Sequence, residues 1–181
     1  MRKLTCPPTA ELLGMYLSAY ISNLQSVETR PVVEKYGLMN LDPQGWYPAH
    51  KWLDALNELS DQPNLSPNTL AIGMEIGKLV PVPPDMENPT LEQMLMGLDF
   101  AYQAAHRNGD VGKFVCEKLG EKHYRIACTD LYPDDLTYGL LYSFARRFLP
   151  PKTLFKVYYD EQITPRDEGG DGATVIHVTW E

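Results

Sequence analysis

The sequence lacks a long apolar run. No stretch approaches the roughly 18 to 20 apolar residues that a helix needs to cross a bilayer, so we expect no membrane span. The opening Met1-Arg2-Lys3-Leu4-Thr5-Cys6 superficially resembles a signal peptide with a lipidated cysteine, but Pro7, Pro8 and Glu11 interrupt any apolar core there. We therefore expect a cytoplasmic protein.

Positive charge is also scarce. The 16 Lys and Arg residues face 24 Asp and Glu residues, giving a net charge of -8 at pH 7. Nucleic-acid binding needs a dense cationic face, which makes DNA or RNA an improbable partner. Hydrophobic residues make up 44% of the chain, which is enough for a core, and low-complexity tracts are missing. The composition indicates a folded acidic protein.

Metal and disulfide motifs are missing. The four histidines form no pair at i, i+2 or i, i+4, and the chain has no Cys-x-x-Cys, so no metal site is expected. Of the three cysteines, Cys116 and Cys128 lie on neighbouring predicted strands. A turn near Gly120-Glu121 would pair Cys116 with Arg125 and place the two sulfurs on the order of 10 Å apart. We expect buried free thiols.

Catalytic motifs are missing as well. Ser143 lies within a predicted helix without the Gly-x-Ser-x-Gly elbow of serine hydrolases. Asp134-Asp135 is predicted to be a helix N-cap with a first-turn carboxylate rather than an acid/base pair. The glycines of 169–172 suit a hairpin loop better than a phosphate loop, because no helix follows them. The sequence therefore predicts no enzyme.

The C-terminal residues 111–181 carry the clearest pattern. Two β-rich runs (113–116 and 123–128) are followed by an amphipathic helix (134–148) and two further strands (154–159 and 174–180). We predict an α+β fold in which an N-terminal helical subdomain (1–110) packs on a four-stranded antiparallel sheet with ββαββ order. The whole chain, 1–181, is expected to form one domain.

The N-terminal half reads as a series of helices. Their predicted starts are Thr9, Arg30-Pro31, Pro48, Ser66-Pro67 and Thr90. Gly73 and Gly77 lie four residues apart and would let another backbone, or a flat ligand, approach closely. Thr90 and Gln93 form a predicted capping box for a helix that runs from Leu91 to His106.

The order of helices, hairpin, helix and hairpin resembles the superfamily of haem nitric-oxide/oxygen-binding domains. That superfamily also includes 4-vinyl-reductase-type ligand-binding domains and transport-protein-particle subunits. The local match is best in Leu98-Asp99-Phe100-Ala101-Tyr102 and in the helix 138–148. The resemblance covers nearly the whole chain and implies a ligand pocket between the two halves.

Two features of the haem-binding members are missing from this chain. Aligning Leu98-Asp99 places Tyr102 where those members have the histidine that ligates iron. Their Tyr-x-Ser-x-Arg run, which holds the haem propionates, is replaced by residues 125–130, Arg-Ile-Ala-Cys-Thr-Asp. The resemblance thus implies the fold and a pocket rather than haem, and the cofactor is left unknown.

Two site residues each have two interpretations. Tyr102 could ligate ferric iron or aim its hydroxyl at a ligand, but an interior tyrosine bonded to a backbone carbonyl is more common. His106, one turn later, could replace the missing ligand, but a histidine in a last helical turn also suits the helix dipole.

We predict a sensory domain that holds a hydrophobic small molecule, with a tetrapyrrole as the family-level candidate, and signals to a partner protein. The predicted pocket residues are Tyr16, Met74, Leu95, Leu98, Tyr102, His106 and Phe144. The alternative is a ligand-free homodimeric interaction or scaffold protein of the same fold.

Overall fold

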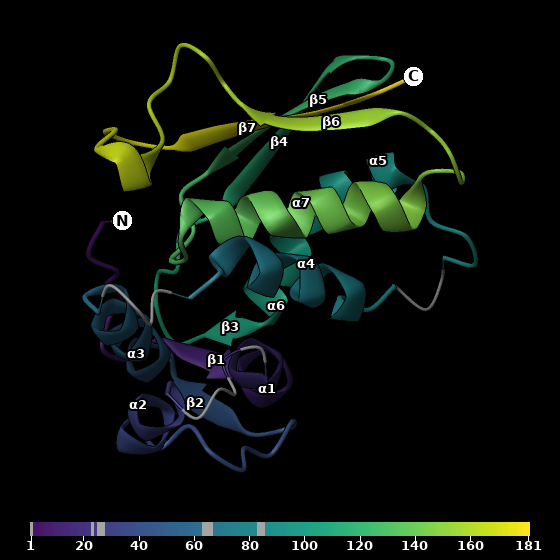
Figure 1. The fold of residues 1–181 in the computed structure, drawn as a ribbon. Coiled ribbons are helices and arrows are strands. Elements are labelled where there is room, and N and C mark those ends of the chain that lie inside the picture. Colours follow the sequence, from purple (N-terminus) through teal and green to yellow (C-terminus); the bar gives the residue numbers. More distant parts are fainter. Residues whose placement is uncertain (1, 23, 25–27, 63–66, 83–85) are drawn as a thin grey trace.

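The C-terminal half contains a four-stranded antiparallel sheet of order β4-β5-β7-β6 (Figure 1). This computed structural model describes residues 2–22, 24, 28–62, 67–82 and 86–181. The sheet strands are β4 (Phe114–Gly120), β5 (His123–Cys128), β6 (Phe155–Tyr159) and β7 (Thr174–Trp180). Helix α7 (Asp134–Phe148) separates the two hairpins in sequence, and a short 3-10 helix, η1 (Arg166–Glu168), lies between β6 and β7. The predicted α+β class and ββαββ order are confirmed.

The first hairpin differs from its predicted register by one residue. Cys116 pairs with Ile126 and Cys128 pairs with Phe114, because the ladder shifts between Lys118 and Gly120. The cysteines are free, but only Cys128 is fully buried, whereas Cys6 and Cys116 are half-buried. Burial raises the pKa of the Cys116 thiol to about 11.

The N-terminal half is helical, but it also contains a small sheet of order β2-β1-β3 that the sequence did not predict. Its strands are β1 (Glu11–Leu13), β2 (Trp46–Pro48) and β3 (His106–Arg107). Leu12 pairs with Tyr47 on one side and His106 on the other. The predicted helix start at Thr9 is therefore wrong, because tertiary strand pairing overrides the helical spacing there. Helix α1 begins at Gly14.

The remaining helices are α1 (Gly14–Ser22), α2 (Arg30–Lys35), α3 (Ala49–Ser60), α4 (Thr69–Leu79), α5 (Leu91–Met96) and α6 (Leu98–Ala104). The predicted cap Ser66 lies outside the described residues. Asn68 caps α4 instead, because its side chain accepts a hydrogen bond from the backbone N–H of Ala71. The predicted capping box of Thr90 and Gln93 is confirmed.

The predicted helix from Leu91 to His106 is divided at Gly97 and ends at Ala104. His106 therefore lies in β3 and not in a last helical turn. Asn108, with φ of 63°, occupies the left-handed region that ends the segment. The pairing of β3 with β1 removes the last predicted residues from the helix.

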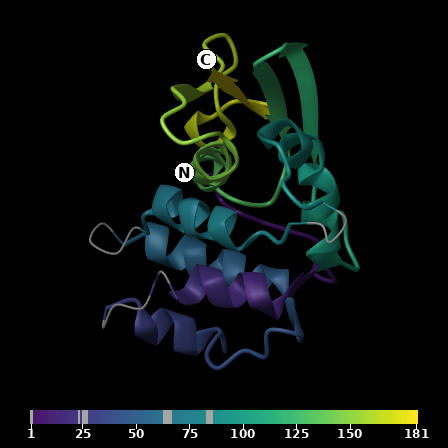
Figure 2. The ribbon, with the colours of Figure 1, turned by 90° about the vertical axis from the view of Figure 1, so that its right-hand side faces the viewer.

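Helix α7 lies between the sheet and α4, and it is viewed nearly along its axis in Figure 2. A Cβ added to Gly73 of α4 would lie 1.9 Å from the Leu136 carbonyl oxygen, and one added to Gly139 would lie 2.1 Å from the Leu70 carbonyl oxygen. The expectation that Gly73 permits close approach of a backbone is confirmed. This contact brings the two halves together. Among the described residues, no helix is both long and apolar enough to span a membrane.

Candidate functional site: a cavity between the two halves

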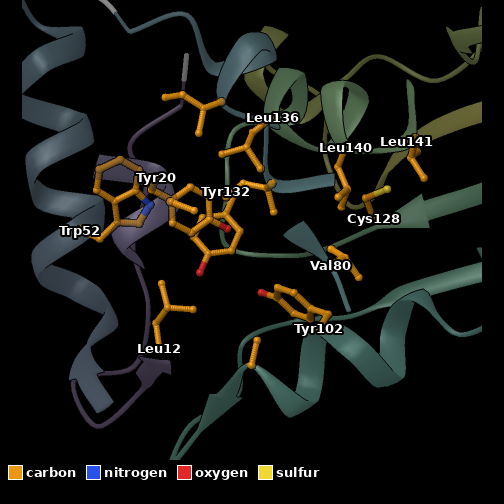
Figure 3. Packing of buried hydrophobic residues seen from close by; sticks show 14 of the residues in the cluster. Leu12, Tyr20, Trp52, Val80, Tyr102, Cys128, Tyr132, Leu136, Leu140 and Leu141 are labelled. Carbon is orange, nitrogen blue, oxygen red and sulfur yellow. The ribbon is translucent and has the colours of Figure 1, made fainter. Parts of the chain in front are cut away.

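A partly enclosed, mostly apolar cavity lies where α1, α4, α6 and α7 meet. Its free space for water-sized molecules is about 50 Å³. The side chains of Leu12 and Tyr20 approach it from the N-terminal half, and those of Leu136 and Leu140 approach it from α7 (Figure 3). Both halves of the chain therefore form its wall.

The structure brings four of the seven predicted pocket residues to this wall. Tyr16, Leu98, Tyr102 and His106 line it. Met74, Leu95 and Phe144 do not: Leu95 and Phe144 are buried elsewhere in the core, and Met74 is half-buried on α4. The close packing of α4 on α7 explains why Met74 does not line the cavity. Its backbone nitrogen lies on the α7 side of α4, 3.0 Å from a Cβ added to Gly139.

Tyr102 is an interior tyrosine whose hydroxyl is fully engaged. The hydroxyl donates to the backbone carbonyl of Val111 at 2.6 Å and accepts from the backbone N–H of Leu131 at 3.2 Å. Burial raises the pKa of Tyr102 well above its ordinary value. The side chain is therefore a neutral phenol that ties α6 to the segments on both sides of the first hairpin.

His106 and Tyr132 form a buried hydrogen-bonded pair beside Tyr102. The Nδ1 atom of His106 lies 2.7 Å from the Tyr102 carbonyl oxygen, so Nδ1 carries the hydrogen. Its Nε2 atom lies 2.6 Å from the Tyr132 hydroxyl and accepts from it. Burial lowers the pKa of His106 to about 4. The imidazole is neutral at physiological pH, with both nitrogens in use.

A buried carboxylate, that of Asp130, lies in the cavity wall. Asp130 is 2% exposed and accepts hydrogen bonds from the Thr137 hydroxyl at 3.2 Å and from Arg166 Nη2 at 3.0 Å. Burial raises the pKa of Asp130 even though Arg166 and Arg2 lower it. The cavity wall thus connects, through Asp130, to the segment between β6 and β7.

Sequence reasoning missed Tyr20, Asp130 and Tyr132. Asp130 and Tyr132 follow β5 in a connection with no periodic pattern, and their proximity to His106 arises only when the two halves pack. Tyr20 lies four residues after Tyr16, a helical spacing that indicates only an apolar helix face. Its ring is stacked on Trp52 at a centroid distance of 5.1 Å and is tilted against Tyr132 at 5.3 Å.

No protein-family model matches the sequence, and no curated protein matches it. The structure, however, is similar to solved H-NOX structures. An H-NOX protein from S. oneidensis in the Fe(II)NO ligation state superposes with a TM-score of 0.64 at 10% identity, covering 93% of this chain and 98% of that one. A mutant H-NOX from T. tengcongensis gives 0.62 at 12% identity, covering 94% and 98%. A structure from work on haem distortion in the H-NOX family gives 0.66 at 12% identity, covering 94% and 95%. This chain has the fold of the haem nitric-oxide/oxygen-binding domains, as its resemblance to them led us to expect.

Proposed function

We propose that this chain is a sensory domain that binds a small, largely apolar molecule between its two halves. The observation that carries the proposal is the partly enclosed cavity, whose wall is apolar apart from a few phenol, imidazole and carboxylate groups. Ligand sites commonly combine an apolar lining with a few convergent polar groups. The H-NOX fold supports the same function, since one of its solved members is described with NO on Fe(II).

Haem does not fit the residues that form this cavity. Its free space is about 50 Å³, whereas pockets for drug-sized ligands measure about 300 to 1,000 Å³. Ligation of iron by either candidate would also break a buried hydrogen bond, because the Tyr102 hydroxyl donates to Val111 and His106 Nε2 accepts from Tyr132. The tetrapyrrole named as the family-level candidate is therefore not part of this proposal.

The ligand we propose has only a few heavy atoms. An apolar cavity of about 150 Å³ holds benzene or xenon, and the present cavity is smaller. Binding in it would change the packing of α7, because Leu136, Thr137 and Leu140 of that helix line the wall. A partner protein could detect such a change only if ligand-bound and ligand-free packing differ.

Xenon is a suitable probe for this cavity. In NMR spectra recorded under xenon pressure, we expect saturable shifts for Leu98, Tyr102 and Leu140. The Ala105→Val variant should lose these shifts, because the larger side chain at this lining position fills part of the cavity. Ala104→Val is the matched control, because Ala104 is exposed beside Ala105. Shifts that persist in Ala105→Val, or that never saturate in the wild type, would contradict the proposal.

Two measurements address the remaining alternatives. After reconstitution with haem and removal of the unbound haem, the protein should show no Soret band. A band that appears in the wild type but is lost in both Tyr102→Phe and His106→Gln would instead show that the cavity opens to admit haem. The alternative of a ligand-free homodimeric scaffold stays a prediction. Size-exclusion chromatography with light scattering measures the oligomeric state of the chain directly.

A further inference from the structure

Two histidines from different strands meet on the face of the C-terminal sheet that points away from α7, where His123 is half-buried and His177 is 7% exposed. The Nε2 atom of His123 on β5 lies 2.8 Å from the Nδ1 atom of His177 on β7. His123 is opposite Thr179 and His177 is opposite Arg125, so the two histidines are diagonal neighbours on adjacent antiparallel strands. Diagonal positions place aromatic side chains within reach of each other. Strand pairing therefore joins two residues that are 54 positions apart in sequence.

Asp160, which follows β6, fixes the orientation of His177. Its Oδ2 atom lies 3.0 Å from His177 Nε2. Because an ionised carboxylate only accepts hydrogen bonds, Nε2 carries the hydrogen and Nδ1 presents its lone pair to His123. The ring of Tyr158 stacks on His177 with a centroid distance of 5.1 Å and an interplanar angle of 11°. Asp160 and Tyr158 thus hold the imidazole of His177 in one orientation, with the lone pair of Nδ1 directed toward His123.

We propose that His123 and His177 bind one divalent transition-metal ion, such as Cu²⁺, Ni²⁺ or Zn²⁺. The ligands are Nε2 of His123 and Nδ1 of His177. Neutral imidazole suits these ions, and a ligating histidine commonly donates its other N–H to a carboxylate, as His177 does to Asp160. On binding, the hydrogen of His123 moves from Nε2 to Nδ1 through solvent, and the two nitrogen lone pairs replace two waters of the ion.

The rest of the coordination sphere is left to water or an external ligand. Across the described ranges, no group of three or more His, Cys, Asp and Glu side chains is arranged to hold a metal. Asp160 bonds to the far nitrogen of His177 and is a positioning residue. The nearby charges are of both signs, since Arg125 pairs with Glu117 at 3.6 Å. The inference is independent of the cavity, because these residues lie on the opposite face of the sheet from α7.

The test is a calorimetric titration of the full chain with Ni²⁺ at neutral pH, in a Cys6→Ser background that removes a competing thiol. We expect one ion per chain for the parent protein and for His50→Ala, which removes a histidine outside the pair. The variants His123→Gln and His177→Ala should lose saturable binding. Asp160→Asn should keep the ligands and bind about 10- to 100-fold more weakly.

Circular dichroism separates loss of the site from loss of the fold. His123→Gln keeps a side-chain amide that can donate to His177, so its spectrum and melting temperature should match the parent without metal. Electron paramagnetic resonance with Cu²⁺ should report two nitrogen ligands in the parent protein. Unchanged Ni²⁺ affinity in folded His123→Gln, or no saturable binding by the parent, would overturn the proposal.

Discussion

The hydrogen bond between His106 and Tyr132 stabilises the fold only while the imidazole is neutral. Burying a polar group without a partner costs free energy, so both side chains depend on this contact. The carbonyl of Tyr102 fixes the tautomer that makes it possible. Protonation of His106 would place a hydrogen on Nε2 and turn an acceptor into a second donor facing a hydroxyl. The pair therefore makes the stability of the domain depend on pH.

We expect the protein to lose stability in acid through His106. An imidazole whose pKa is lower in the folded chain binds its proton more readily in the unfolded chain. Its contribution is complete above the unfolded pKa of 6.5 and is lost as the pH falls toward the folded pKa of about 4. The loss amounts to about 3 kcal/mol. Urea unfolding at several pH values measures it.

The His106→Gln variant isolates this effect, because its amide can both donate and accept but does not titrate. Asp130 acts in the opposite sense: its raised pKa means that protonation favours the folded chain as the pH falls. If the free energy of unfolding of His106→Gln fell in acid as much as that of the wild type, His106 would not be responsible for the loss. His50→Gln should keep the full dependence.

At the scale of elements, the two halves are joined by the contact between α4 and α7. Glycines at the crossing let the two backbones touch, and a methyl group at Gly73 or Gly139 would overlap a carbonyl oxygen. Because that oxygen belongs to a helix backbone, neither side can move aside cheaply. The crossing thus fixes how closely the cavity walls approach.

Gly73→Ala should therefore separate the helices and destabilise the protein by about 3 kcal/mol or more. Gly120→Ala is the control, because its Cβ would meet only His123 Cβ, at an ordinary 3.8 Å. Urea unfolding of both variants makes the comparison. Equal stabilities would show that the contact yields more easily than the geometry indicates.

The other end of α4 is capped from α7. Arg147 Nη1 donates to the carbonyl oxygens of Gly77, Lys78 and Val80 at 3.2, 3.1 and 2.8 Å. These carbonyls lie at the C-terminal end of α4, where the helix leaves acceptors unpaired. Arg147→Ala should cost about 1 kcal/mol. Arg146→Ala, which removes the exposed neighbouring arginine, should change the melting temperature much less.

At the scale of the whole molecule, one largely buried ionic cluster joins three distant segments. Arg2 near the N-terminus bonds to Asp134 at 3.3 Å and to Asp167 at 2.7 Å. Arg166 bonds to Asp130 at 3.0 Å and to Asp134 at 2.8 Å. The cluster holds the N-terminal segment and the β6–β7 connection against the start of α7. The predicted first-turn carboxylate is confirmed, but the N-cap residue is Pro133 and not Asp134. The sequence did not reveal the partners of Asp134.

Removing Arg166 should leave two buried carboxylates without their main partner. Asp130 and Asp134 are each 2% exposed, so they cannot recover their hydration. Arg166→Leu should destabilise the protein by about 3 to 5 kcal/mol. Arg30→Leu, which breaks an exposed pair with Glu34, is the control and should cost little. Guanidinium unfolding measures both, and similar losses would contradict the role of the cluster.

The elements that could be predicted are those with strong local signals. The helix 134–148 and the strand 174–180 have the predicted bounds. The helix is 15 residues long and the strand 7, so each is long enough to show its periodic pattern of apolar residues in full. The strands of the small sheet have only two or three residues each, too few for a period to show. The site was predicted in part for the same reason: Leu98 and Tyr102 belong to a periodic helix, whereas Tyr132 lies in an irregular connection.

The sequence by itself determined the α+β class, the order of the hairpins around α7 and the absence of an imidazole at position 102. These follow from residue type and spacing, which act over a few residues. Only the tertiary structure decided that the Tyr102 hydroxyl is tied to Val111, that His106 accepts from Tyr132 and that His123 meets His177. Each of these contacts joins separate elements, so it depends on how the elements pack and on which buried polar groups must find partners.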